Sequence, residues 1–477
     1  MSCTTILAGR NATYDGSCLI ARNDDSGAGH YTAKKFVVVE PDQQPRQYES
    51  VISHVKIELP DDPMRYTAMP NAVQGQGTWA AAGINAANVS MTATETITSN
   101  ALVQGADPLV VYDPETGTPG GIGEEDIVVL TLPYIHTARE GVLRLGQLLE
   151  KYGTYEMNGI AFADVNEVWY LETIGGHHWM ARRLPDDCYA VIPNQLGLDE
   201  FDFADAYGAK ENYLCSPDLK QFVEENHLDL NLDGKFNPRL AFGSHDDADY
   251  VYNTPRAWYV QTQLNPSTAS EIHPYDDDLA WCRVPEHKIT VEEVKTLLSS
   301  HFQRTPYDPY TEGPDAGKFR CIGINRTAFL SVSQMRPDNE SIEWIAFAAN
   351  PFNVLVPYYA DVKILPNYVS DTTGTVNTDS FYWTSRLIAA MADASFKTSQ
   401  IFIERYQNAV AGQSHALLNK YDAQIAQTAD PDTRMRLREK ANEEITNMVK
   451  AQAEAVLDKV LYNLSNQMKD AFSRSDA

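Results

Sequence analysis

The sequence predicts an α+β fold in which short strands come first and long helices come last. Residues 3–100 alternate short apolar runs with turns, a pattern typical of strands. Residues 124–152 instead carry apolar side chains at helical spacing. From Thr378 onward almost every residue favours a helix. Three helices are predicted there, over residues 380–392, 397–428 and 431–474.

Composition and charge exclude several classes of partner. The 477-residue chain has 38 Lys and Arg against 65 Asp and Glu, a net charge of −27. Such acidity argues against nucleic acid or an anionic membrane as a partner, because phosphates would be repelled. No segment approaches the ~20 apolar residues of a membrane-spanning helix, and none resembles a secretory signal. The six cysteines are scattered without a Cys-x-x-Cys pair, which predicts a reducing cytoplasm rather than disulfides or zinc.

The first predicted strand is the start of the chain, Met1–Gly9, and the second is Cys18–Arg22. Asp15-Gly16 between them predicts a hairpin with a long loop. A second hairpin is predicted from residues 77–85 and 88–95.

The middle of the chain mixes helices and strands. Residues 105–123 are predicted as a loop, and 124–152 as two helices broken near Pro133. A meander of four short strands is predicted over 159–164, 168–172, 179–182 and 189–192. A helix is predicted over 290–302, with Thr290 as N-cap and Glu293 completing a capping box. Two further strands are predicted over 328–333 and 342–348.

Cys3 lies at the start of a predicted strand, which is an unusual position for a thiol. If Met1 and Ser2 are removed, Cys3 carries both a nucleophile and a free α-amine that can take the thiol proton. If the first two strands pair, Arg22 and an aspartate fall near Cys3. A guanidinium favours the thiolate, and a carboxylate can orient the α-ammonium. The alternatives are a small buried cysteine and a surface ion pair.

Other motifs carry weaker signals. Residues 229–234 match the opening of a calcium loop, but position 12 is Leu240 where a carboxylate is needed, so a polar turn is predicted. Adjacent residues on a strand point to opposite faces, so His177 and His178 predict a turn or a substrate contact rather than a metal site. The sequence has no Gly-x-Ser-x-Gly, Gly-x-Gly-x-x-Gly or Walker motif.

Several stretches together match a known group. Cys3-Thr4-Thr5 and residues 21–25 (Ala-Arg-Asn-Asp-Asp) resemble the start of the choloylglycine hydrolase and penicillin V acylase group of N-terminal-nucleophile (Ntn) hydrolases. The closer resemblance is to the bacterial dipeptidase A branch, which is related to secernins. Its hallmarks are similar to residues 123–126, 172–179, 252–258 and 323–327. The resemblance covers nearly the whole chain.

The resemblance implies an αββα sandwich, two antiparallel sheets between helical layers. Residues 1–377 would form the hydrolase domain, and 378–477 a helical extension packed on the same unit. It implies five catalytic residues. Cys3 would be the nucleophile, Arg22 and Asp25 would hold the thiolate and the amine, Asn194 would donate its amide to the oxyanion, and Arg256 would lie at the back of the site.

The sequence departs from the acylase pattern at two places. Glu95 stands where the acylase group has an oxyanion-hole asparagine, so we expect Glu95 or Thr94 to bind the substrate ammonium, with His177 as a further substrate contact. Ser2 lies between Met1 and Cys3, so either Met1-Ser2 is removed by self-cleavage or Ser2 is itself the nucleophile. A thiol is the stronger nucleophile near neutral pH, which favours Cys3.

The prediction is therefore a cytoplasmic cysteine dipeptidase that acts through a thioester and requires neither metal nor cofactor. Dipeptides are the expected substrates, and the helical region after Thr378 is the expected surface for homo-oligomers. Two alternatives remain. One is an acylase acting on a non-peptide amide of the bile-salt or penicillin V type. The other is a secernin-like protein that uses the scaffold for interaction, whose mature chain would keep Met1 or Ser2.

Overall fold

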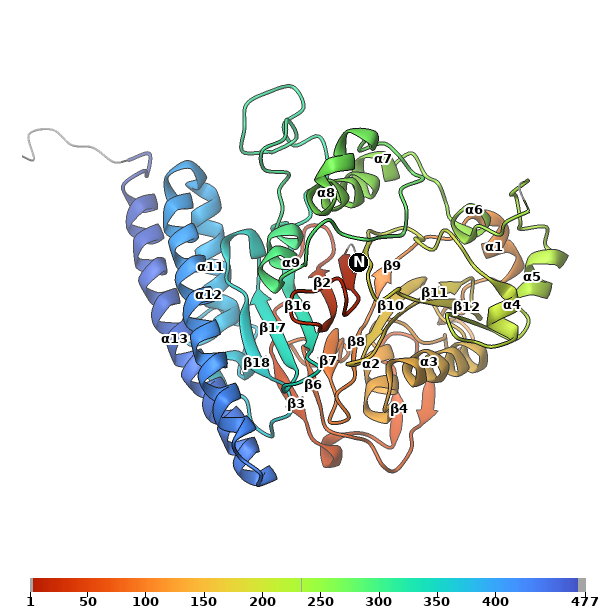
Figure 1. The fold of residues 1–477 in the computed structure, drawn as a ribbon, viewed down its shortest axis with the longest axis horizontal. Coiled ribbons are helices and arrows are strands. Elements are labelled where there is room, and N and C mark those ends of the chain that lie inside the picture. Colours follow the sequence, from red (N-terminus) through yellow and green to blue (C-terminus); the bar gives the residue numbers. More distant parts are fainter. Residues whose placement is uncertain (1–2, 233, 471–477) are drawn as a thin grey trace, which may run out of the picture.

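The computed structural model describes residues 3–232 and 234–470, and it contains two large antiparallel sheets (Figure 1). The first sheet has the strand order β15-β13-β1-β2-β16-β17-β18. Its strands are β1 (Thr4–Ala8), β2 (Cys18–Asp25), β13 (Tyr189–Ile192), β15 (Cys282–Arg283), β16 (Thr327–Met335), β17 (Ile342–Phe347) and β18 (Val356–Tyr359).

The second sheet has the order β14-β12-β11-β10-β8-β7, with β9 also paired to β10. Its strands are β7 (Ala82–Ile84), β8 (Ser90–Thr92), β9 (Glu95–Thr96), β10 (Asn158–Ala163), β11 (Val168–Ile174), β12 (His178–Arg183) and β14 (Tyr213–Cys215). Two small two-stranded sheets pair β3 (Val37–Val39) with β6 (Tyr66–Ala68) and β4 (Gln47–Glu49) with β5 (Lys56–Glu58).

Helices flank both sheets. They are α1 (Ala101–Ala106), α2 (Ile127–Thr131), α3 (Ala138–Tyr152), α4 (Phe203–Tyr207), α5 (Leu219–Glu225), α6 (Pro238–Phe242), α7 (Asp249–Tyr252), α8 (Thr254–Leu264), α9 (Val291–Leu298), α10 (Asn367–Ser370), α11 (Phe381–Ala394), α12 (Phe396–Ala426) and α13 (Pro431–Ser465). Short 3₁₀ turns cover Pro41–Gln43, Leu132–Tyr134, Pro266–Glu271 and Asn350–Phe352. Two antiparallel sheets with separate helices confirm the predicted α+β class.

The alternation of side chains along the strands separates three apolar cores. Leu7 and Ile20 of the first sheet pack in one core with Tyr170 and other residues of the second sheet. Ile6 of β1 points the other way, into the core shared with α9 and the long helices α11 to α13. The opposite face of the second sheet is covered by α2 and α3. Figure 1 shows these helices outside the sheets, α11 to α13 on one side and α2 and α3 on the other.

The N-terminal hairpin forms as predicted. β1 and β2 pair antiparallel, with Thr5 opposite Arg22, and β2 extends to Asp25. The second predicted hairpin is also present as β7 and β8, in shorter strands. The predicted break near Pro133 is confirmed, because a 3₁₀ turn separates α2 from α3.

The predicted four-strand meander is wrong in its last strand. β10, β11 and β12 are consecutive neighbours, but β13 crosses to the first sheet and pairs with β1. The turn at 185–188 makes this possible, because Asn11 and Gly9 donate backbone hydrogen bonds to Asp186 and Cys188. These bonds place the start of β13 beside the end of β1, and the two faces of β13 pack in two different cores.

Three helix ends differ from the prediction. Thr290 caps α9 as expected, but the side chain of Glu293 contacts His287, and the helix ends at Leu298. Phe302 has a φ of 61°, outside the helical region, so the helix cannot reach it. α13 ends at Ser465, before residue 474, which lies outside the described residues. In the described part of the chain, no helix is both long and apolar enough to cross a membrane.

Candidate active site

Four strands of the first sheet begin or end at the same edge, which is formed by the strand ends and not by an outer strand. Cys3 directly precedes β1, Asp25 ends β2, Asn194 follows β13, and Arg326 precedes β16. The register places these residues together, because Thr5 pairs with both Arg22 and Ile192, and Thr327 pairs with Asp25. In Figure 1 this edge lies beside the label N. Residues from four distant parts of the sequence are thus brought to one place.

Cys3 is fully buried and contacts a charged network. Arg22 Nη2 lies 2.9 Å from Cys3 Sγ and 2.7 Å from Glu124 Oε1. The same guanidinium nitrogen lies 3.1 Å from Asp24 Oδ1, and Lys34 Nζ lies 3.5 Å from Asp24 Oδ2. Burial raises the pKa of the Cys3 thiol, and the positive charge of Arg22 opposes that rise. Arg22 is therefore the group here that favours the thiolate.

The two aspartates at the end of β2 differ in their contacts. Asp24 shares with Arg22 the face of β2 that looks towards Cys3. Asp25 lies on the other face, where Thr327 Oγ1 donates to it at 2.6 Å and Arg320 forms an ion pair with it. The structure thus brings Arg22 and Asp24 to the thiol and places Asp25 against β16.

Arg256 and Asn194 form a second network beside Cys3. Arg256 Nη1 donates to the backbone oxygen of Cys3, and at 2.7 Å to Thr4 Oγ1. Its Nη2 donates to Asn194 Oδ1 at 2.8 Å and to Asn253 Oδ1 at 2.5 Å. Arg256 therefore fixes the backbone of the cysteine and the amide of Asn194 at the same time.

Glu95 joins this network from the second sheet. It is 1% exposed, Thr5 Oγ1 donates to Oε2 at 2.7 Å, and Asn194 Nδ2 donates to Oε1 at 2.9 Å. Asn194 Nδ2 also donates to the backbone oxygen of Thr96 at 3.0 Å. Burial raises the pKa of Glu95 to about 8, against the opposing charges of Arg256 and Arg22. Burial therefore disfavours the ionised form of Glu95, and the two arginines favour it.

The other two predicted substrate contacts lie in different surroundings. Thr94 is buried, and its hydroxyl donates to Asn158 Oδ1 at 2.5 Å. The side chain of His177 is 46% exposed, and its Nδ1 lies 2.9 Å from Asp107 Oδ1. His178 Nδ1 lies 2.7 Å from the other oxygen of Asp107. None of these contacts joins Thr94 or His177 to the Cys3 network.

The two histidines also correct a geometric expectation. They were expected to point to opposite faces, yet both rings reach one carboxylate. The reason is that His177 precedes β12 and follows Gly175, whose φ of 61° turns the chain. Hydrogen bonds from both histidines hold the pKa of Asp107 at about 2, against the effect of burial. Among the described residues no group of three or more His, Cys, Asp and Glu is arranged to hold a metal ion.

The sequence did not single out Glu124 and Glu156 as site residues. Glu124 is 102 residues from Arg22 in sequence, and its backbone N–H donates to Glu156 Oε1 at 2.5 Å. Burial raises the pKa of Glu124, and that of Glu156 to about 7. The motif at residues 123–126 was the signal that could have pointed to Glu124, but spacing alone gave no partner for it.

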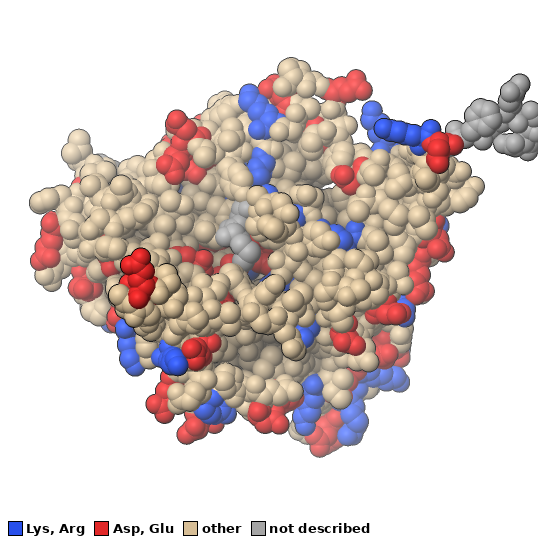
Figure 2. All heavy atoms as spheres, turned by 180° about the vertical axis from the view of Figure 1, so that it is seen from behind, with Lys and Arg blue, Asp and Glu red and all other residues tan. Residues whose placement is uncertain are grey.

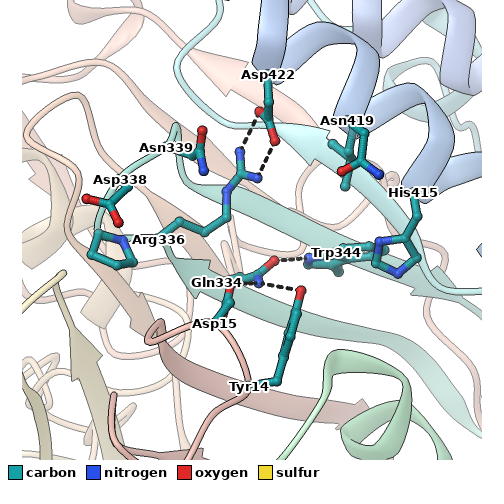
Figure 3. Close-up of a pocket in the computed structure, with 12 residues that line it drawn as sticks. Tyr14, Asp15, Gln334, Arg336, Asp338, Asn339, Trp344, His415, Asn419 and Asp422 are labelled. Atoms are coloured by element: carbon teal, nitrogen blue, oxygen red, sulfur yellow. Dashed lines mark hydrogen bonds and ion pairs between the residues drawn. The ribbon is translucent and has the colours of Figure 1, made fainter. Parts of the chain in front are cut away.

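A separate cavity of about 210 Å³ lies at the opposite end of the same strands (Figure 3). Arg336 and Asp422 form a bidentate ion pair there, with distances of 2.7 and 3.0 Å. Gln334 connects Trp344 to Asp15 through bonds of 2.8 and 2.7 Å. The polar groups of these side chains pair with one another and link α12 to the end of β16. We therefore interpret the lining residues as stabilising the fold and not as a binding site.

Charge is dispersed over one face of the molecule. On the face drawn in Figure 2, Asp and Glu side chains form several separate groups with Lys and Arg between them. That face therefore offers no single large patch of one sign to a charged macromolecule.

Comparison with known proteins identifies the family of the chain. The family described as Peptidase family C69 matches residues 2–409. A "Dipeptidase" from Bifidobacterium longum (strain NCC 2705) is 48% identical over 532 aligned residues that cover 100% of both chains. A "Probable dipeptidase A" from Streptococcus pyogenes serotype M18 is 49% identical, covering 100% of this chain and 98% of that protein. "Dipeptidase A" from Lactobacillus helveticus is 43% identical over 89% of this chain and 88% of its own. With a match across most of its length, the chain belongs to peptidase family C69.

Proposed function

We propose that the chain is a cysteine dipeptidase of the N-terminal-nucleophile class, with Cys3 as its nucleophile. The observation that carries the proposal is the 2.9 Å contact between Arg22 Nη2 and Cys3 Sγ at the start of β1. The names of the relatives at 43–49% identity support dipeptides as substrates. Two antiparallel sheets flanked by helices agree with the proposed αββα sandwich.

The chemistry requires that Met1 and Ser2 be removed, because in the full chain the nitrogen of Cys3 belongs to a peptide bond. The free α-amine then takes the thiol proton, and the thiolate attacks the scissile carbonyl. The resulting α-ammonium protonates the leaving amine, which leaves a thioester on Cys3. The same amine activates a water molecule, which hydrolyses the thioester and releases the N-terminal amino acid of the dipeptide.

Asn194 is the proposed side-chain donor to the oxyanion of the tetrahedral intermediate, together with a backbone N–H. Its Nδ2 donates to Glu95 and Thr96. The oxyanion would replace Glu95 as the acceptor of the hydrogen bond from Asn194 Nδ2. Glu95 would then be close to the substrate, as its proposed contact with the substrate ammonium requires. Thr94 and His177 remain proposed contacts further from the thiol.

One of the two aspartates of β2 is proposed to orient the α-ammonium. The family resemblance favours Asp25, while the geometry favours Asp24, which shares the face of Arg22. Comparison of Asp24→Asn with Asp25→Asn decides between them. The variant that loses the orienting carboxylate retains substrate binding but loses turnover.

The wider proposal concerns organisation and location. We propose that residues 1–377 form the catalytic unit and that 378–477 are a helical extension packed against it, a division that α11 to α13 support. The family match continues to residue 409, inside α12, so the extension is in part common to the family. We further propose a cytoplasmic homo-oligomer that needs no metal or organic cofactor.

The decisive experiment combines intact mass with activity. We expect the purified protein to lack Met1 and Ser2 and to hydrolyse dipeptides. Iodoacetamide should abolish this activity, EDTA should not, and Cys3→Ala should lose at least ~10³-fold in kcat/KM. Cys215→Ala, on β14 of the second sheet, is the matched control and should keep full activity. A mature chain that keeps Ser2 with full dipeptidase activity would refute Cys3 as the N-terminal nucleophile.

A further inference from the structure

Two cysteines that the proposed mechanism does not use lie side by side where β15 forms the outer strand of the first sheet. Cys188 directly precedes β13, and Cys282 begins β15. Ala190 of β13 pairs with Cys282, and Tyr189 pairs with Arg283. Because side chains alternate along a strand, Cys188 and Cys282 project from the same face of the sheet as diagonal neighbours.

Packing and a direct contact agree with this placement. Cys188 and Ala190 belong to the apolar core between the two sheets, and Cys282 packs against the same core. Tyr189 points the other way, into the core behind the first sheet. The thiols of Cys188 and Cys282 are hydrogen-bonded to each other. The fold therefore holds these two thiols together as a pair.

The two thiols differ in acidity. Their hydrogen bond lowers the pKa of Cys282 against the effect of burial, and it raises the pKa of Cys188. The positive charge of Arg182 also favours the Cys282 thiolate, and its guanidinium carbon lies 5.1 Å from the ring centroid of the preceding residue, Trp281. Burial and Asp187, whose Oδ1 lies 3.6 Å from Cys188 Sγ, disfavour a thiolate at Cys188. Cys282 is thus the thiolate of the pair, and Cys188 is its proton donor.

The other cysteines of the chain differ from Cys282 in acidity. Burial raises the pKa of Cys18 to about 12 and the pKa values of Cys215 and Cys321 to about 11. Burial also raises the pKa of the Cys3 thiol, so Cys282 is the one of the six cysteines whose pKa is lowered. Cys282 is half-buried, whereas Cys3 and Cys18 are at most 1% exposed. Because thiolate character and exposure decide which thiol an oxidant attacks, Cys282 is the expected first target.

We propose that a peroxide oxidises Cys282, which Arg182 activates, and that Cys188 then closes a reversible disulfide with it. The Cys282 thiolate attacks one peroxide oxygen, the O–O bond breaks and hydroxide leaves, so that Cys282 becomes a sulfenic acid. The Cys188 sulfur then attacks the Cys282 sulfur, the S–O bond breaks, and the Cys188 proton leaves with the hydroxyl group as water. The two sulfurs together lose the two electrons that the peroxide gains. A small thiol reverses the reaction by exchange.

Closure of the S–S bond requires a small movement of β15. Diagonal neighbours on paired strands have Cα atoms about 7–8 Å apart, and a disulfide needs about 6.8 Å or less. β15 has two residues and lies outermost in the first sheet, so it has few partners to lose when it shifts. The pair lies at the end of β13 opposite to Asn194. The inference is independent of the proposed function, because the reaction does not involve Cys3.

The test treats the reduced protein with hydrogen peroxide at pH 7.5, at roughly one peroxide per chain. The remaining thiols are blocked with N-ethylmaleimide before peptide mapping by mass spectrometry without reductant. We expect the peptides that contain Cys188 and Cys282 to be joined, with the loss of two hydrogens, and dithiothreitol to separate them again. Cys215 and Cys321 are half-buried single cysteines that serve as internal controls and should stay reduced.

Variants separate the two steps. Cys188→Ala removes the second sulfur, so Cys282 should stop at the sulfenic acid, which dimedone traps as a stable adduct. Cys282→Ala removes the thiolate, so Cys188 should stay reduced at the same dose. Arg182→Gln should slow the oxidation of Cys282 about 3-fold or more, because it removes a charge that favours the thiolate. Arg283→Gln, next to Cys282 but on the opposite face of β15, is the matched control and should keep the wild-type rate.

The inference is overturned if no wild-type peptide joins Cys188 to Cys282, or if Cys215 or Cys321 is oxidised before them. This result needs no variant, so it stands even where a variant fails to fold. Circular dichroism and Tm establish which variants are folded. The inference is also overturned if the dimedone adduct of folded Cys188→Ala lies at another cysteine, or if folded Arg182→Gln reacts as fast as Arg283→Gln.

Discussion

Among the neighbours that shift the pKa of the Cys3 thiol, Arg22 is the cation in contact with it. Burial and the carboxylates of Glu95, Glu124 and Asp24 all raise its pKa, and Arg22 is the neighbour that lowers it. Arg22 is itself fully buried between the thiol and Glu124. Its effect on reactivity can therefore be separated from any contact with substrate.

Arg22→Gln should raise the pKa of the Cys3 thiol, because it removes the charge that favours the thiolate. We expect the pH dependence of alkylation by iodoacetamide at Cys3 to move upward by about one pH unit or more. Arg22→Lys, which keeps the charge, should move it less. The rate is followed by mass spectrometry of the N-terminal peptide, with Arg405→Gln, at an exposed position on α12, as control. An unchanged profile in folded Arg22→Gln would show that Arg22 does not activate the thiol.

Glu95 has two candidate tasks that kinetics can separate. If it binds the substrate ammonium, Glu95→Gln should raise KM for dipeptides about 10-fold with kcat within about 3-fold, because an ion pair is lost from binding. N-acetylated dipeptides, which lack the ammonium, should be unaffected. We expect this outcome. A fall in kcat with constant KM would instead assign Glu95 to holding Asn194.

At the residue scale, a contact could be predicted from the sequence only where its two residues are close along the chain. Cys3 and Arg22 are 19 residues apart on one hairpin, so pairing the strands was enough to bring them together. Glu124 reaches Arg22 across 102 residues and from the turn before α2, and no local pattern carries that information. The same holds for Asp25 and Arg320, which are 295 residues apart.

At the scale of elements, α9 packs against the strands that carry Cys3 and Arg22. It packs against β1, β2 and β16, and the backbone oxygen of Leu298 accepts a 2.7 Å hydrogen bond from Asn23 Nδ2. Asn23 lies between Arg22 and Asp24 on β2. The C-terminal end of α9 therefore helps to fix the position of β2.

Thr290→Ala should loosen the start of α9, because the hydroxyl accepts the N–H of Glu293 at 3.1 Å. Loss of such a cap costs about 1 kcal/mol. Because about 1 kcal/mol changes the local opening equilibrium about 5-fold, hydrogen–deuterium exchange of the first amides of α9 should become about 5-fold faster. Thr290→Ser keeps the acceptor and should exchange at nearly the wild-type rate. Equal exchange in Thr290→Ala and the wild type would mean that packing alone holds this helix end.

Elements with local signals were predictable, and those set by distant partners were not. The hairpin of β1 and β2, the Pro133 break and the Thr290 cap each depend on residues close in sequence. β13 has an apolar pattern as good as that of β12, yet it joins a different sheet. Its choice depends on β1, more than 180 residues earlier, as the pairing of Thr5 with Ile192 shows.

At the scale of the whole molecule, the layered cores enclose several carboxylates. Glu343 of β17 is one of them, fully buried, with Ser333 Oγ at 3.3 Å from both of its carboxyl oxygens. Burial raises its pKa to about 8. The site at Cys3 has a comparable group in Glu95, but Glu343 takes no part in the proposed chemistry, so its effect on stability can be measured alone.

The sign of the pH effect follows from this raised pKa. Between pH 4.5, the ordinary value for a glutamate, and about pH 8, the folded protein keeps a proton at Glu343 that the unfolded chain releases. The free energy of unfolding therefore falls as pH rises through that window, by up to about 1.4 kcal/mol per pH unit for this one group. The stability that the proton provides is fully present below pH 4.5 and is lost as pH rises to about 8.

Glu343→Gln should remove this dependence, because the amide keeps a neutral group of nearly the same shape in the core. We expect the variant to have a higher Tm than the wild type at pH 7.5 and a similar Tm at pH 4.5. The difference between the two Tm curves isolates Glu343 from the other buried acids, which remain in both proteins. Glu454→Gln, at an exposed position on α13, should leave the curve unchanged. Parallel Tm curves for Glu343→Gln and the wild type would show that Glu343 is ionised in the folded protein, stabilised by a partner in the core.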